Sequence, residues 1–88
     1  VQLHVPADPD REILAYNRQG QLHKKLLSEP MARELRRLLA PESDWTVVEG
    51  EWLKAKDLIY LFDFLKEDGK SLERLPFAER WKKLPRAY

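Results

Sequence analysis

The segment from Leu58 to Leu65 (LIYLFDFL) is the feature that most restricts the possible folds of this chain. Alternate residues of an extended strand share a face, and both faces of this segment are apolar. One face carries Leu58, Tyr60, Phe62 and Phe64, and the other carries Ile59, Leu61 and Leu65, interrupted only by Asp63. The pattern predicts a strand that is covered on both sides. The run is also far shorter than the roughly 20 residues that a membrane-spanning helix needs.

The surrounding residues predict partners for this strand. Residues 45–53 (WTVVEGEWL) are rich in β-branched and aromatic types, and Lys54 to Asp57 form a connection short enough for a hairpin. At the start of the chain, residues 1–5 alternate between apolar and polar types and residues 6–10 carry turn-forming residues. Residues 12–17 are typical of a returning strand. We therefore expect two β-hairpins.

Two helices are expected as well. The first begins at Ser28, Glu29 and Pro30, because serine can cap free amides, an acid suits the positive end of the helix dipole, and proline is tolerated in the first turn. Pro41 ends this helix, and Pro76 opens the second one after a tight turn at 68–69. The apolar stripes are Met31, Leu35, Leu38 and Leu39 in the first helix and Phe77, Trp81 and Leu84 in the second. The sequence thus predicts one α+β domain over residues 1–88, an antiparallel β-sheet with two helices in the order ββ-α-ββ-α.

The composition restricts the class of protein. The 88 residues include 16 basic and 15 acidic side chains, which give a net charge of +1. The net charge therefore does not favour binding to nucleic acid or to an anionic membrane. The lack of cysteine excludes disulfides and thiolate metal sites, and no secretory signal is visible. We expect an intracellular protein, cytoplasmic or nucleoid-associated, with no membrane partner. The chain starts at Val1 inside an expected strand, so we expect it to be cut from a longer protein.

Five residues are candidates for a site. Glu49 and Glu51 share a strand face about 7 Å apart, where like charges cost stability unless a cation, a donor or a partner meets them; a solvated edge strand is the alternative. Gly50 between them allows a ligand or another backbone to approach closely. The ring of Phe62 either packs in the core or stacks on a base. Arg18 lies in a loop, where it either stays in solvent or binds phosphate.

Catalytic and metal-binding patterns are not visible from spacing alone. His4 and His23 have no carboxylate or histidine at ligand spacing around them, so we expect no metal site at either. The sequence offers no Ser-His-Asp arrangement, no glycine-rich phosphate loop and no cysteine nucleophile. The spacing of residues therefore predicts no enzyme by itself.

The order of four segments is more informative than any of them alone. The succession YNRQG, a helix, VVEGEW and LIYLFDFLKEDGKSLERLPFAER resembles the adenylation domain of ATP-dependent polynucleotide ligases, which are covalent nucleotidyltransferases. The resemblance covers nearly all of the chain, including the tail LPFAER at residues 75–80. It implies that the chain is an internal segment of a nucleotidyltransferase (ATP-grasp-like) adenylation domain that supplies part of an adenine-nucleotide pocket.

The resemblance also implies roles for individual residues. Arg18 matches an arginine on the phosphate side of the nucleotide, and Phe62 matches the aromatic residue that stacks on adenine. Glu51 matches the glutamate near the ribose and the divalent metal, which makes it both a nucleotide-binding and a metal-binding candidate. Glu49 stands where the family usually has aspartate, which keeps the charge but lengthens the side chain. The implied cofactors are ATP (bound as AMP) and Mg²⁺, in the parent enzyme.

The part of the family pattern that is missing limits what the chain is expected to do. Family members attack ATP with the lysine of a K-x-D-G motif that lies just ahead of the strand that residues 1–5 resemble. The K-x-D-G tetrapeptide of this sequence, KEDG at residues 66–69, falls in the expected tight turn and not at that position. We therefore expect no self-adenylylation, although the parent would be an ATP-dependent DNA ligase that seals nicked duplex DNA in repair, replication and recombination. A segment severed from its sheet exposes unpaired strand edges, so self-association is expected.

Two other interpretations stay open. The chain could be a small non-catalytic interaction module whose aromatic residues fill its core, with Glu49 and Glu51 on a wet edge. It could instead be a nucleic-acid-binding domain that uses Arg33, Arg36 and Arg37 of the first helix, although a solvated helix face is the simpler explanation of these arginines.

Overall fold

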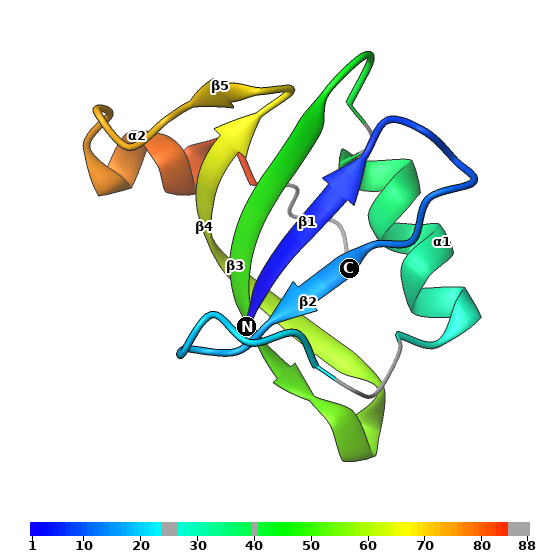
Figure 1. The fold of residues 1–88 in the computed structure, drawn as a ribbon. Coiled ribbons are helices and arrows are strands. Elements are labelled where there is room, and N and C mark those ends of the chain that lie inside the picture. Colours follow the sequence, from blue (N-terminus) through cyan, green and yellow to red (C-terminus); the bar gives the residue numbers. More distant parts are fainter. Residues whose placement is uncertain (24–26, 40, 85–88) are drawn as a thin grey trace.

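The computed structural model describes residues 1–23, 27–39 and 41–84. Five strands form one antiparallel sheet in the order β2-β1-β3-β4-β5, and two helices accompany it (Figure 1). The expected α+β class, the antiparallel sheet and the two helices are confirmed. The strands are β1 (Gln2–Pro6), β2 (Leu14–Tyr16), β3 (Trp45–Leu53), β4 (Leu58–Glu67) and β5 (Lys70–Ser71). The helices are α1 (Glu29–Leu39) and α2 (Phe77–Lys82), and a short 3₁₀ turn, η1 (Lys54–Lys56), joins β3 to β4.

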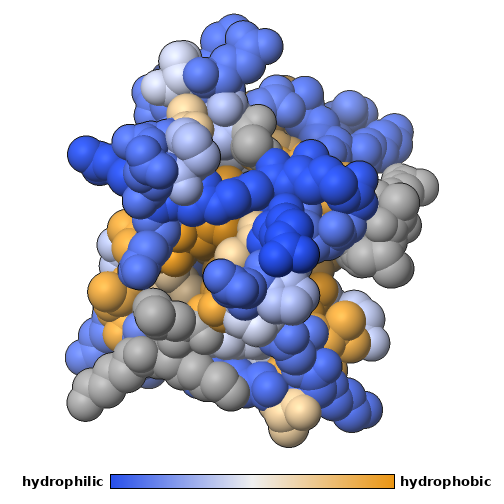
Figure 2. All heavy atoms as spheres, turned by 90° about the vertical axis from the view of Figure 1, so that its right-hand side faces the viewer, coloured by the Kyte–Doolittle hydropathy of each residue, from blue (hydrophilic) through white to orange (hydrophobic). Residues whose placement is uncertain are grey.

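Helix α1 covers one face of the sheet and supplies much of the core. The Ser28 hydroxyl accepts a hydrogen bond from the backbone N–H of Met31 at 3.3 Å, which is the expected N-terminal cap. Leu35 and Leu39 are buried as predicted, and Leu38 packs partly against the same cluster. Fully buried residues from two strands meet this helix: Leu3, Val5 and Val48. The side of the molecule that carries α1 faces the viewer in Figure 2, where hydrophilic residues cover most of the surface.

The C-terminal part differs from the expectation in two ways. Asp68 (φ 48°) and Gly69 (φ 86°) form the predicted tight turn, but the chain continues into a fifth short strand, because two positive φ angles match the twist of a hairpin. In α2 the expected apolar stripe is wrong, since Phe77 and Trp81 are exposed and no residue of the helix is buried. Leu84, just beyond α2, is buried in the core.

The prediction that β4 is covered on both sides is also wrong for its first half. Leu58, Tyr60 and Phe62 are 37%, 55% and 44% exposed, whereas Phe64 is buried at 4%. The physical reason is a β-bulge: Glu49 pairs with Asp63 and Gly50 pairs with Leu61, so Phe62 has no partner in β3. The extra residue reverses the alternation of faces, which places Phe64 in the core and leaves the earlier aromatic rings outside.

Position 50 requires glycine because the backbone of β4 lies very close to it. A Cβ atom at this position would lie 2.5 Å from the carbonyl oxygen of Tyr60 in β4. The sequence predicted that Gly50 allows either a ligand or another backbone to approach closely. The structure shows the approach of a backbone, that of the neighbouring strand β4.

Candidate functional site

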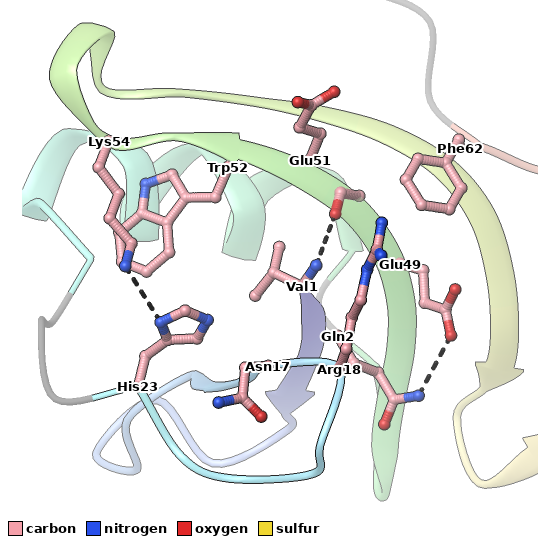
Figure 3. Close-up of a pocket in the computed structure, with 11 residues that line it drawn as sticks. Val1, Gln2, Asn17, Arg18, His23, Glu49, Glu51, Trp52, Lys54 and Phe62 are labelled. Carbon is pink, nitrogen blue, oxygen red and sulfur yellow. Dashed lines mark hydrogen bonds between the residues drawn. The ribbon is translucent and has the colours of Figure 1, made fainter.

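A cleft of about 640 Å³ opens between the loop that follows β2 and the strands β3 and β4 (Figure 3). Its size falls within the range of small-molecule sites, roughly 300–1,000 Å³. The cleft brings together Arg18, Glu51 and Phe62, the three residues predicted to bind a nucleotide, although they come from distant parts of the sequence. The other residues that line it are Val1, Gln2, Asn17, His23, Glu49, Gly50, Trp52 and Lys54.

Phe62 contributes an accessible aromatic wall. Its ring lies on the same exposed face of β4 as Tyr60, just before the bulge reverses the alternation, and it is 44% exposed. Glu51 lies on the neighbouring strand β3, and both residues lie across the cleft from the β2 loop (Figure 3). A flat apolar surface and an acceptor are thus presented on adjacent strands.

The two carboxylates of β3 have different surroundings. Glu49 is partly buried, and one of its oxygens accepts a hydrogen bond of 3.4 Å from Nε2 of Gln2 in β1. Glu51 is exposed and forms no hydrogen bond or ion pair with any residue in the described part of the chain. The carboxylate of Glu51 is therefore the one available to an incoming ligand.

Arg18 is placed by a loop that is held through one asparagine. The side-chain oxygen of Asn17 accepts hydrogen bonds from the backbone N–H groups of Gln19 and Gln21, both at 2.9 Å. Gly20, with φ at 77°, supplies the left-handed conformation that closes the turn. The Arg18 side chain points from this loop toward β3 (Figure 3), and no ion pair with it occurs within residues 1–23, 27–39 and 41–84.

The cleft contains a second cation that sequence reasoning did not single out. Nζ of Lys54 lies 3.2 Å from Nδ1 of His23 and 5.1 Å from the ring centre of Trp52. Burial lowers the pKa of His23 and the positive charge of Lys54 lowers it further, which favours a neutral imidazole that accepts a hydrogen bond from the lysine ammonium group. From the sequence, Lys54 was expected only to be part of the hairpin connection, because no local pattern indicates that this hairpin lies next to the β2 loop.

The structure offers little for a metal ion by itself. Among the described residues, no group of three or more histidine, cysteine, aspartate or glutamate side chains is arranged to hold one. Glu51 lies on the same strand face as Glu49, so a Mg²⁺ ion there would need most of its oxygen ligands from water or from a bound phosphate.

His4 contributes to packing on the sheet surface. Its ring lies edge-on to Tyr16 and Trp45, at 4.9 Å and 6.5 Å between ring centres, and Nε2 lies 2.9 Å from Oε1 of Gln2. Burial and, to a smaller extent, the charge of Lys66 lower its pKa.

Two of the three arginines of α1 are engaged within the molecule. Arg36 donates hydrogen bonds to the carbonyl oxygens of Asp8 and Arg11, which attaches α1 to the β1–β2 connection. Arg37 forms an exposed ion pair with Glu34 one turn earlier in the helix. These contacts reduce the number of α1 cations that are free to meet nucleic acid.

Comparisons of the chain with protein-family models, with curated proteins and with solved structures find no match in any of the three. Within the described residues, no helix is both long and apolar enough to cross a membrane.

Proposed function

We propose that this chain is a segment of the adenylation domain of an ATP-dependent polynucleotide ligase, and that its cleft binds the adenine nucleotide. The observation that carries the proposal is the position of Arg18, Glu51 and Phe62 in one cleft. These residues were selected from the sequence on three separate motifs.

Each group of the nucleotide finds a suitable partner in the cleft. The base stacks on the ring of Phe62, a contact worth on the order of 1–3 kcal/mol. The ribose hydroxyls donate to the free carboxylate of Glu51. The phosphates face Arg18 on the opposite wall, where a guanidinium can donate two parallel hydrogen bonds, with Lys54 as an additional positive charge.

Magnesium and DNA belong to the proposal only through the parent enzyme. There Glu51 would hold Mg²⁺ together with phosphate oxygens, and the ion would neutralise charge on the phosphates. The parent would seal nicks in duplex DNA, as needed in replication, recombination and repair. The K-x-D-G tetrapeptide of the chain, residues 66–69, lies at the turn between β4 and β5, and Lys66 does not line the cleft. The residues of the cleft therefore bind and orient the nucleotide without forming a covalent adenylate.

The first test is the affinity of the chain for AMP, measured by isothermal titration calorimetry. Phe62→Ala should weaken binding by about tenfold or more, because the stacking contact is lost. Since the ring is 44% exposed, the same change should lower the free energy of unfolding by only about 1 kcal/mol.

Tyr60→Ala is the matched control for this substitution. Tyr60 is an exposed aromatic residue of the same strand, and it does not line the cleft. Its removal should leave the affinity for AMP unchanged. Equal affinities for AMP in the wild-type chain and in Phe62→Ala would contradict the proposal.

The interaction-module interpretation makes the opposite prediction for Phe62. If that ring were a core residue, its truncation would cost about 3–5 kcal/mol of folding free energy. The exposed ring and the free carboxylate of Glu51 favour the nucleotide site over this alternative.

Self-association through a strand edge is a further part of the proposal. The outer edge of β2 is covered by its own loop, since Tyr16 bridges to Leu22 and the carbonyl oxygen of Ala15 accepts the N–H of His23 at 2.8 Å. In contrast, β5 pairs with β4 only at Lys66 and Glu67. Within the described residues, the outer edge of β4 from Leu58 to Phe64 has no strand partner, and this is the edge on which we place a second copy.

A further inference from the structure

A partly buried ion pair ties α2 to β4 directly beside the bulge at Phe62. Asp63 follows Phe62 in the chain, and its carboxylate accepts two hydrogen bonds from Arg80, at 2.7 Å from Nε and 3.1 Å from Nη2. The side chains are 12% and 17% exposed, far less than those of the Arg37–Glu34 pair at the surface. We call this contact the Asp63–Arg80 clamp.

The clamp is anchored at both ends. On the β4 side, Oδ1 of Asp63 also accepts the backbone N–H of Phe64 at 2.8 Å, which fixes the strand immediately after the bulge. On the α2 side, Nη1 of Arg80 donates to the carbonyl oxygen of Leu75 at 2.8 Å, and the guanidinium lies 5.6 Å from the ring centre of Phe77. One arginine therefore connects the loop before α2, the helix itself and β4.

Apolar packing alone does not explain how α2 is held in place. None of its residues is buried, and the neighbouring core contacts come from Leu72 before the helix and Leu84 after it. Removing one member of a buried charged pair leaves the other without a partner, so the geometry of α2 and of the bulge is expected to depend on this contact. The hydrogen bonds that Arg80 donates to Asp63 raise the pKa of Arg80, and the guanidinium is charged at any physiological pH.

We propose that Arg80 is a positioning residue for the nucleotide site: through Asp63 it fixes the bulge in β4 and thereby holds the ring of Phe62 at the wall of the cleft. Arg80 does not line the cleft itself. The inference rests on the proposed function, because the ring matters to a ligand only if the cleft binds one.

The test uses the whole chain labelled with 4-fluorophenylalanine, which places a fluorine on each of its three phenylalanines. The ¹⁹F resonances are assigned with Phe62→Leu and Phe77→Leu. Arg80→Lys keeps the charge but removes the two-pronged contact with Asp63. It should shift the resonance of Phe62, change its sensitivity to exchange of H₂O for D₂O, and weaken AMP binding about tenfold.

Arg37→Lys is the matched control, because it makes the same chemical change in the other arginine–carboxylate pair, which lies on α1 and is exposed. It should alter neither the Phe62 resonance nor the affinity for AMP. Should Arg80→Lys prevent folding, Asp63→Glu is the second variant, since it keeps both charges of the pair and displaces the carboxylate by one methylene group.

The outcomes separate the two proposals. An unchanged Phe62 resonance in Arg80→Lys, or a shifted resonance with unchanged affinity for AMP, would overturn the positioning role. If the wild-type chain binds no AMP while Arg80→Lys still shifts the Phe62 resonance, the proposed function is wrong. The effect of Arg80 on the position of the Phe62 ring is then still supported.

Discussion

A single additional residue in β4 decides which aromatic rings reach the solvent. Without the bulge at Phe62, strict alternation would place Tyr60, Phe62 and Phe64 on the same face. With it, Phe64 is 4% exposed and Phe62 is 44% exposed. Bulges are common next to functional sites, and here the bulge separates the buried Phe64 from Phe62, which lines the cleft.

Asp68 is a second residue whose effect extends beyond its own position. Its carboxylate accepts hydrogen bonds from the backbone N–H groups of Ser43, at 3.1 Å, and Asp44, at 2.7 Å, and these bonds lower its pKa below the ordinary value. Because the folded state then binds protons less readily than the unfolded state, Asp68 stabilises the fold above the pKa of an unfolded aspartate. This contribution should be lost as the pH falls below about 4, through the lowered pKa.

The pH dependence is measured by urea denaturation of the wild-type chain and of Asp68→Asn between neutral and acidic pH. Asparagine tolerates the left-handed backbone conformation that residue 68 adopts, so the variant keeps the turn. The difference in unfolding free energy between the two proteins should shrink as the pH falls. A difference that stays constant down to the lowest accessible pH would contradict this assignment.

At the scale of the elements, local signals predicted the helices and hairpins well. The cap at Ser28, the stripe through Leu35 and Leu39 and the turn at Asp68 depend only on residues close in sequence, and the structure confirms each of them. A bulge depends instead on how two neighbouring strands align. No residue type marks the position of a bulge in the sequence, so strict alternation was assumed along β4 and the strand was expected to be covered on both sides.

The same distinction applies to the candidate site. Arg18, Glu51 and Phe62 were selected from three separate segments of the sequence, and the structure places all three beside one cleft. Lys54 and His23, which are 31 positions apart, come together only through tertiary packing, and so do the two residues of the Asp63–Arg80 clamp. In α2 the spacing of Phe77 and Trp81 matched a buried stripe, but polar contacts hold the helix in place.

For the molecule as a whole, the open edge of β4 predicts self-association. The weight-average mass in sedimentation equilibrium should rise with concentration, because a second copy can pair with the unoccupied backbone groups. Leu58→Lys, on that edge, should keep the chain monomeric, since an edge lysine opposes strand pairing.

Leu22→Lys serves as the control for this effect. Leu22 is an exposed leucine of the β2 loop, away from the β4 edge, so its replacement changes charge and hydrophobicity by the same amount. The variant should associate as the wild-type chain does. A wild-type chain that remains monomeric at every concentration would rule out the pairing at β4.

The central claim is that adenine stacks on Phe62, and intermolecular nuclear Overhauser effects between AMP and the chain test it most directly. The account predicts cross-peaks from the adenine H2 and H8 protons to the ring of Phe62, with upfield shifts of both protons from the ring current. It also predicts no cross-peaks from adenine to Tyr60, which lies outside the cleft. Adenine protons that contact Tyr60, or that contact no aromatic ring while AMP is bound, would contradict it.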